Sequence, residues 1–203
     1  DGSLGICPEL PAYLSALAPL FPSRALAVDA GTGDGSWLDV LAPIFERVVA
    51  LDRSEAQIER AKQRSAERGF SNVEFLCEPL GAGSAKRVLG SGADLDVASR
   101  MLHHAPLPRE AMNELVALAR EGGSVLVIDY AHHDDERLSE QQADVWLGFE
   151  PSELRELASG AGLVDISVTD VPRAFSRGTS DGHIPWICLL GRRASGARPK
   201  SKR

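Results

Sequence analysis

A glycine-rich turn between two acidic residues is the feature of this sequence best suited to hold a small ligand. The turn, Gly31-Thr32-Gly33-Asp34-Gly35, directly follows an apolar run at residues 24–30. Glycine adopts positive φ angles readily and lets the backbone pass close beneath a ligand. The dinucleotide-binding fingerprint requires G-x-G-x-x-G, but Ser36 occupies its sixth position here. The turn therefore predicts a ligand site without the buried pyrophosphate of a dinucleotide.

The two acidic residues indicate what the turn holds. Asp52 ends a second apolar run, where a carboxylate can accept two hydrogen bonds from ribose hydroxyls. Asp29 precedes the turn, where it would repel a phosphate and attract a cation such as an amino-acid ammonium. A nucleoside with an amino-acid tail has both features, and S-adenosylmethionine is such a molecule. The competing interpretation is an ordinary strand–turn–helix unit with a solvated aspartate.

Four of the five histidines form two adjacent pairs, His103-His104 and His132-His133. Each pair follows the carboxyl end of a predicted strand, and open α/β sheets bind ligands outside that edge. Imidazole can remove a proton near pH 7, so His104 and His133 are candidate general bases. Two other interpretations stay open: a histidine that hydrogen-bonds loop backbone, and a metal site built from His and Asp. Since no i,i+4 spacing on a helix supports a metal, no metal ligand is assigned from the sequence.

Strand and helix signals alternate along the chain and must position these residues. The predicted helices lie at residues 8–20, 36–45, 54–68, weakly within 81–92, at 110–120 and at 151–161. The predicted strands lie at residues 24–30, 47–51, 73–76, 95–99, 124–128, 163–169 and 184–190. This order predicts a doubly wound, Rossmann-like α/β fold with a seven-stranded, mostly parallel sheet. The last strand is expected to be antiparallel, because no helix separates it from the strand before.

Composition narrows the class of protein. A chain of 203 residues with 43% hydrophobic and 25% charged residues is typical of one soluble globular domain. No apolar run reaches the roughly 18 residues of a membrane span. Three widely spaced cysteines form no metal or disulfide pattern, so we expect reduced thiols and a cytoplasmic location. The net charge of −7 disfavours nucleic acid as a partner.

Longer segments resemble a known family. VDAGTGDG followed by VVALDRS resembles motifs I and II of class I S-adenosylmethionine-dependent methyltransferases, and AREGGSVLVIDYA resembles their glycine-ended helix and fifth strand. MLHHAP, AHHDD and ADVWLGFEPSELRELASGAGL are similar to a narrower group. Those are methyltransferase domains fused to ArsR-type regulators, which are related to ubiquinone-biosynthesis-type methyltransferases. The resemblance implies a methyltransferase domain at residues 24–193, between an N-terminal helical segment at 1–23 and a flexible basic tail at 194–203.

The resemblance also implies S-adenosyl-L-methionine as the cofactor and a role for each matching residue. The methionine part would be held by the turn and by the end of the fourth strand, and the adenosine by residues after the second and third strands. The implied residues are Asp29, Gly31, Thr32, Gly33 and Ser99 for methionine, Asp52 for ribose, and Arg53 and Glu78 for adenine.

Two functions follow from the resemblance. The first is methyl transfer to a small-molecule acceptor by in-line displacement. Association of the chain into a homo-oligomer is compatible with this function. The second is a non-catalytic domain that senses S-adenosylmethionine or S-adenosylhomocysteine in a transcriptional regulator, since a chain beginning with Asp1 leaves room for an upstream DNA-binding module. A cavity beside the methyl group, bordered by His103-His104, residues 130–133 and residues 146–149, would favour the enzyme.

Overall fold

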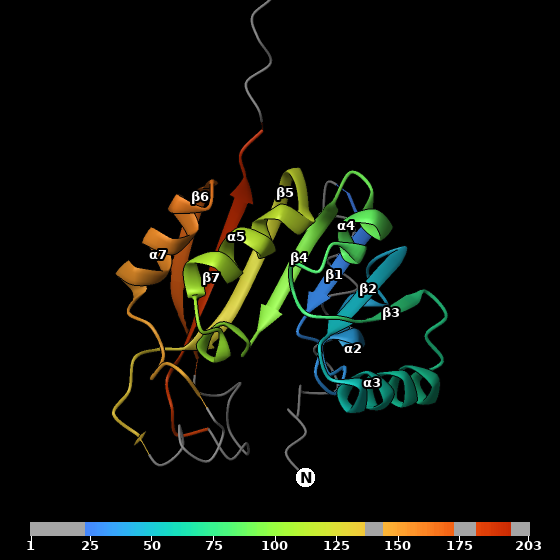
Figure 1. The fold of residues 1–203 in the computed structure, drawn as a ribbon, viewed down its shortest axis with the longest axis horizontal. Helices are drawn as coiled ribbons and strands as arrows, with labels where there is room; N and C mark the ends of the chain where they lie inside the picture. Colours follow the sequence, from blue (N-terminus) through green and yellow to red (C-terminus); the bar gives the residue numbers. More distant parts are fainter. Residues whose placement is uncertain (1–22, 137–143, 173–181, 196–203) are drawn as a thin grey trace, which may run out of the picture.

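The computed structural model describes residues 23–136, 144–172 and 182–195, which form one sheet with helices on both faces (Figure 1). The helix expected at residues 8–20, most of the polar loop after residue 172 and the basic tail from residue 196 lie outside the described residues.

The sheet has seven strands in the order β3-β2-β1-β4-β5-β7-β6. Strand β7 is antiparallel to both of its neighbours, β5 and β6, and the other pairs are parallel. The predicted fold class, including the antiparallel last strand, is therefore confirmed. The strands are β1 (Leu26–Ala30), β2 (Arg47–Asp52), β3 (Val73–Cys77), β4 (Ala93–Ser99), β5 (Ala119–Tyr130), β6 (Leu163–Val171) and β7 (Trp186–Arg193).

The helices begin and end largely where local chemistry predicts. Ser54 caps α3, its side chain accepting from the Gln57 backbone N–H at 3.4 Å, and Gly69 ends that helix with a φ of 73°. Glu150 and Glu153 form a reciprocal capping box at the start of α7. The helices are α2 (Leu38–Leu41), α3 (Glu55–Arg68), α4 (Ser84–Leu89), the 3₁₀ turn η2 (Leu102–His104), α5 (Pro108–Leu118) and α7 (Pro151–Gly160).

Two predicted boundaries were wrong. Helix α2 is four residues long instead of the ten expected for residues 36–45, because a series of turns follows Gly35. The pair Gly122-Gly123 was expected to end a helix, but α5 ends at Leu118 and the pair lies inside β5. A Cβ atom on Gly123 would lie 2.6 Å from the Ala93 carbonyl oxygen, so the pair lets β5 approach the start of β4 closely.

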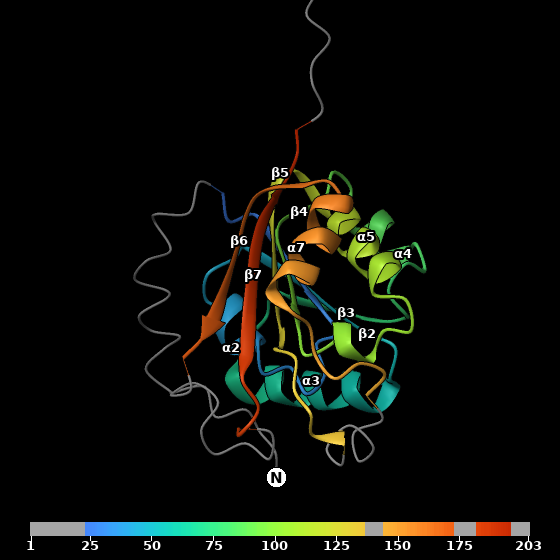
Figure 2. The same ribbon diagram turned by 90° about the vertical axis from the view of Figure 1, so that its left-hand side faces the viewer.

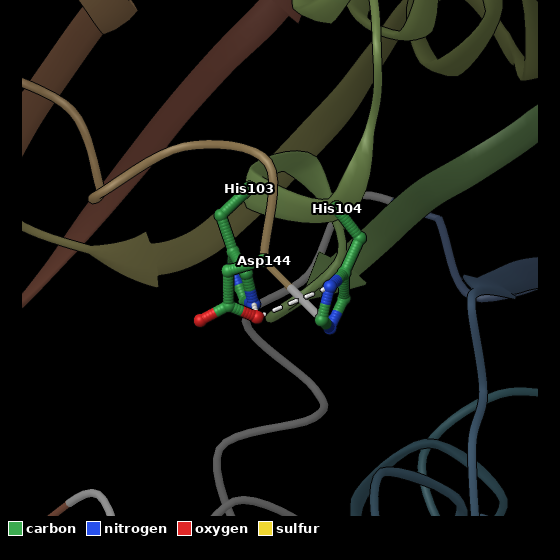
Figure 3. A group of neighbouring side chains, drawn as sticks. All are labelled: His103, His104 and Asp144. Atoms are coloured by element: carbon green, nitrogen blue, oxygen red, sulfur yellow. Dashed lines mark ion pairs between the residues drawn. The ribbon is translucent and has the colours of Figure 1, made fainter. Parts of the chain in front are cut away.

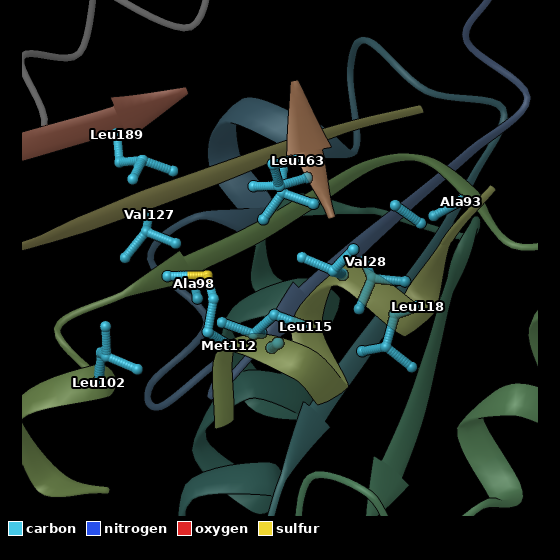
Figure 4. Packing of buried hydrophobic residues seen from close by; sticks show 14 of the residues in the cluster. Val28, Ala93, Ala98, Leu102, Met112, Leu115, Leu118, Val127, Leu163 and Leu189 are labelled. Atoms are coloured by element: carbon cyan, nitrogen blue, oxygen red, sulfur yellow. The ribbon is translucent and has the colours of Figure 1, made fainter. Parts of the chain in front are cut away.

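Apolar residues cover both faces of the sheet. On one face, side chains of β1, β4 and β5 pack against α4, α5 and α7, with Met112 and Leu115 of α5 at the centre (Figure 4). Figure 2 shows these three helices together on one side of the sheet. On the opposite face, Leu38 and Leu41 of α2 pack with Ala61 of α3. None of the helices in the described ranges is long and apolar enough to cross a membrane.

One carboxyl group inside the sheet has an unfavourable environment. Asp96 of β4 is fully buried, and among the described residues neither of its carboxylate oxygens has a hydrogen-bond partner. Burial, together with the charge of Asp29, raises the pKa of Asp96 well above its usual value. The folded protein therefore retains a proton that the unfolded chain releases, and Asp96 weakens folding progressively as the pH rises from about 3.8 through the raised pKa.

We expect Asp96→Asn to raise the free energy of unfolding by roughly 1–3 kcal/mol at neutral pH, because asparagine stays unpaired in the sheet but removes the cost of the proton that the folded Asp96 must retain. The difference in free energy of unfolding between this variant and wild type should increase from acidic to neutral pH, and urea denaturation measures it. Asp94→Asn is the matched control: burial raises the pKa of Asp94, but hydrogen bonds from Arg120 and the Leu26 backbone outweigh it and lower this pKa. That variant should lose stability at neutral pH, and an equal loss in both variants would contradict the prediction.

Candidate active site

A cavity of about 1280 Å³ opens at the carboxyl ends of β1, β2 and β4, the edge where the sequence predicts a ligand. Ligand pockets usually measure about 300–1,000 Å³, so this cavity has room for a second molecule beside a nucleoside. Its wall is formed by residues that follow the strands, by one face of α5 and by Tyr130. The lining segments include residues 31–34, 51–54, 78–81, 99–101 and 103–107.

The glycine-rich turn forms one end of this cavity. The backbone N–H groups of Gly31 and Thr32 donate to the Leu51 carbonyl oxygen at 2.8 and 2.9 Å, which folds the turn back over β2. Gly31 has a φ of 75°, and a Cβ atom there would lie 2.9 Å from Cγ of Met101. The position therefore requires glycine for both conformation and space, as the motif predicts.

Asp52 fixes the turn from the end of β2. Its Oδ2 accepts from the Gly33 N–H at 3.0 Å, and its Oδ1 accepts from the Ser54 N–H at 2.8 Å. Each carboxylate oxygen can accept a further hydrogen bond. Because Asp52 also lines the cavity, its carboxylate is positioned to receive the two hydroxyls of a ribose while it holds the turn.

Asp29 lies behind the turn rather than on the cavity wall. Its side chain is buried, and the Thr32 hydroxyl donates to its Oδ2 at 2.6 Å. Thr32 itself lines the cavity, so it stands between Asp29 and a bound molecule. Burial raises the pKa of Asp29 to about 7; the Thr32 hydrogen bond opposes this rise, and the charges of Asp52 and Asp34 add to it.

The other three residues implied for the cofactor also line the cavity: Arg53, Glu78 and Ser99. Glu78 has a second partner, because its Oε1 accepts from the Ala85 N–H at 2.7 Å near the start of α4. Ser99 ends β4 and is followed by Arg100, which has a φ of 52°. Seven of the eight implied residues therefore line the cavity, and Asp29 lies behind Thr32.

The two histidine pairs do not share one wall. His103 and His104 line the cavity, whereas neither His132 nor His133 is among its lining residues. His133 is buried, its Nδ1 accepts from the Asp135 N–H at 3.2 Å, and burial lowers its pKa. Of the two candidate bases, His104 therefore lies at the cavity and His133 lies away from it.

Sequence reasoning missed the acid that holds the first pair. Asp129 at the end of β5 is fully buried, and its Oδ1 lies 2.6 Å from His103 Nδ1. The same carboxylate accepts backbone N–H groups of Leu102 at 2.9 Å and Tyr130 at 2.8 Å. The aromatic ring of Tyr130 stacks on His103 with the ring centres 4.5 Å apart. The signal in the sequence was an acid at the carboxyl end of a strand, the same signal that identified Asp52.

The segment expected to roof the cavity contacts it only in part. Backbone hydrogen bonds join His132 to Phe149 and His133 to Leu147, so residues 131–133 run beside residues 147–149. Trp146 stacks on Phe149, and its Nε1–H donates to the Ala105 carbonyl oxygen at 2.9 Å. The described cavity wall includes Tyr130 and the first histidine pair, but residues 146–149 lie outside it.

Comparison with known proteins agrees with this geometry. A family profile described as "Methyltransferase domain" matches residues 23–159. The chain is 29% identical over 118 residues to tRNA 5-carboxymethoxyuridine methyltransferase of Escherichia coli K12, covering 58% of this chain and 44% of that protein. It is 27% identical over 189 residues to 2-methyl-6-phytyl-1,4-hydroquinone methyltransferase 1 of Oryza sativa, covering 90% of this chain and 54% of that protein. The chain thus spans about half the length of these curated relatives.

Solved structures share the fold. The N-methyltransferase NodS of Bradyrhizobium japonicum, crystallised with S-adenosylhomocysteine, superposes with a TM-score of 0.65 at 16% identity. The superposition covers 91% of this chain and 86% of NodS.

Proposed function

Because this chain belongs to the methyltransferase domain family, whose class I enzymes use S-adenosylmethionine, we propose that it transfers the cofactor's methyl group to a small-molecule acceptor. The observation that carries this proposal is the continuity of the cavity. It runs from Asp52 and the glycine-rich turn past Ser99 to His104 and Tyr130, and its volume exceeds what one ligand needs. A cavity with room for an acceptor beside the cofactor supports an acceptor-binding enzyme over a domain that only senses the cofactor.

In-line transfer breaks the bond between the methyl carbon and the sulfonium sulfur while the acceptor atom forms its own bond to that carbon. The sulfur leaves as a neutral thioether, so alignment of the two molecules and exclusion of water supply most of the rate enhancement. A base is needed only where the acceptor must lose a proton. His104, on the cavity wall, is the residue that we propose for this step.

A small molecule is favoured over RNA as acceptor because the chain carries a net charge of −7. The segments MLHHAP and AHHDD support the narrower assignment to the group found behind ArsR-type regulators. The decisive experiment incubates the chain with methyl-labelled S-adenosylmethionine and follows transfer to a panel of small molecules and to tRNA by mass spectrometry. We expect label in a small-molecule product. Tight binding of S-adenosylhomocysteine with no transfer to any acceptor would support the sensing function instead, and label in tRNA would overturn the acceptor class.

The affinity for S-adenosylhomocysteine should rise with pH up to about 7 and level off above it, because the pKa of Asp29 is raised to about 7. The ligand's ammonium, bound beside Thr32, favours the ionised carboxylate and lowers this pKa. Binding then releases a proton and strengthens as the pH rises through the window below about 7. Calorimetry in buffers of different ionisation enthalpy measures that proton.

Asp29→Asn is the control for this pH dependence. It keeps the size of the side chain and a hydrogen-bonding partner for Thr32 but cannot ionise. Its affinity profile should be flat over the same range. A wild-type affinity that does not change with pH would contradict the role given to Asp29.

A further inference from the structure

We propose that His103, His104 and Asp144 bind a divalent transition-metal ion at the wall of the cavity (Figure 3). Asp144 Oδ1 lies 3.4 Å from His103 Nε2 and 3.2 Å from His104 Nδ1, and all three ligand atoms lie within 4.8 Å of one another. Ligands at about 2.0–2.1 Å from a tetrahedral ion are about 3.4 Å apart. The two separations that involve Asp144 are therefore those of ligands on one ion, and the two histidine nitrogens lie within 4.8 Å of each other.

His103 is oriented for this role by Asp129. The buried Asp129 carboxylate lies 2.6 Å from His103 Nδ1 and is placed to accept its N–H, and in the neutral ring of that tautomer the lone pair is on Nε2. His103 Nε2 is buried and makes no hydrogen bond within the described structure, although a carboxylate oxygen lies 3.4 Å away. A metal ion held by Nε2 would give this buried nitrogen a partner and would lie next to the Asp144 carboxylate. A carboxylate that fixes the far nitrogen of a histidine is the arrangement that accompanies metal-binding histidines in proteins.

Asp144 is held in place by the chain that follows it. The backbone N–H groups of Val145 and Trp146 both donate to the His103 carbonyl oxygen, at 3.0 and 3.1 Å. The Trp146 indole donates to Ala105, just beyond η2. The side chain of Asp144 is fully buried. Residues 144–146 are therefore joined to the histidine pair by backbone contacts, which keep Asp144 beside it.

The donor set indicates the kind of ion. Two imidazole nitrogens and one carboxylate suit zinc and divalent iron, cobalt or nickel, whereas magnesium and calcium prefer oxygen ligands. Because His103 and His104 line the cavity, remaining coordination positions can face a bound molecule. If the proposed methyl transfer holds, an acceptor hydroxyl bound there would lose its proton to water more readily and keep the electron pair for attack. The ion would then replace His104 as the group that activates the acceptor.

The test uses the full chain after removal of metals with a chelator. Calorimetric titration with Zn²⁺ and the visible absorption of Co²⁺ should both show one ion per chain. His104→Ala and Asp144→Asn should each weaken binding at least about tenfold, since even the outer partners of metal ligands change affinity by about 10–100-fold. The matched control is His132→Ala, an exposed histidine of the other pair, which should bind as wild type does.

Two outcomes would overturn the site: no ion bound by the wild type, or equal affinity in wild type and both ligand variants. Titration of each variant with S-adenosylhomocysteine verifies its fold, because His104 is partly exposed and its removal opens no core cavity. Metal binding without methyl transfer would count against the proposed function alone, and the reverse result against the metal site alone.

Discussion

Asp129→Ala is expected to lower the free energy of unfolding by about 3–5 kcal/mol, the usual loss when one partner of a buried charged network is removed. The Asp129 carboxylate accepts from His103 Nδ1 and from the backbone N–H groups of Leu102 and Tyr130. Alanine would leave all of these buried donors unpaired at the point where β5 meets η2. Urea denaturation measures the loss.

Two variants make this prediction specific. Asp170→Ala removes an exposed aspartate from strand β6 and should change stability by less than about 0.5 kcal/mol. Asp129→Asn keeps an acceptor oxygen and should fall between wild type and alanine. If Asp129→Ala were as stable as Asp170→Ala, the hydrogen bonds around Asp129 would contribute nothing to folding.

Asp52→Ala is expected to weaken S-adenosylhomocysteine binding about tenfold to a hundredfold, corresponding to the roughly 1.5–3 kcal/mol of hydrogen bonds to a charged group. The loss has two sources. The ribose hydroxyls lose their acceptor, and the N–H of Gly33 loses the carboxylate that holds the turn. Calorimetric titration gives the change in Kd.

Glu59→Ala is the control for Asp52→Ala. Glu59 is an exposed acid on α3 whose recorded ion-pair partner is the neighbouring Lys62, so its removal leaves the cavity wall intact. The affinity of Glu59→Ala for S-adenosylhomocysteine should match that of wild type. A wild-type affinity in Asp52→Ala, with the fold verified by denaturation, would remove Asp52 from the binding site.

The side of the cavity formed by the glycine-rich turn and Asp52 was predictable because its signals are local in sequence. The turn at residues 31–35 contains its own conformational requirements, and Asp52 stands at the end of the neighbouring buried strand. The hydrogen bond from Gly33 to Asp52 joins two consecutive β-strand ends. Parallel pairing of β1 with β2 brings them together in any fold of this class.

The other side of the cavity was not predictable, because its contacts join residues far apart in the chain. Asp129 meets His103 across 26 positions, and Asp144 reaches the pair from an irregular segment. Periodicity describes helices and strands, but it carries no information about where such a segment crosses the sheet edge. The predicted boundary between α5 and β5 was wrong for a related reason. Glycine pairs commonly end helices, and only the close approach of β4 shows why Gly122-Gly123 lies in a strand.

The position of β7 has a consequence for the growing chain on the ribosome. Strand β6 pairs with β7 alone in the described sheet, and β7 separates it from β5. Until residues 186–193 have been translated, the edge of β5 that faces away from β4 has no partner strand, and β6 has none at all. Unpaired edges readily accept strands from other chains. Premature termination between β6 and β7 should therefore yield a truncated chain with unpaired strand edges. We expect this chain to need chaperones to stay soluble, although it contains every residue around the glycine-rich turn.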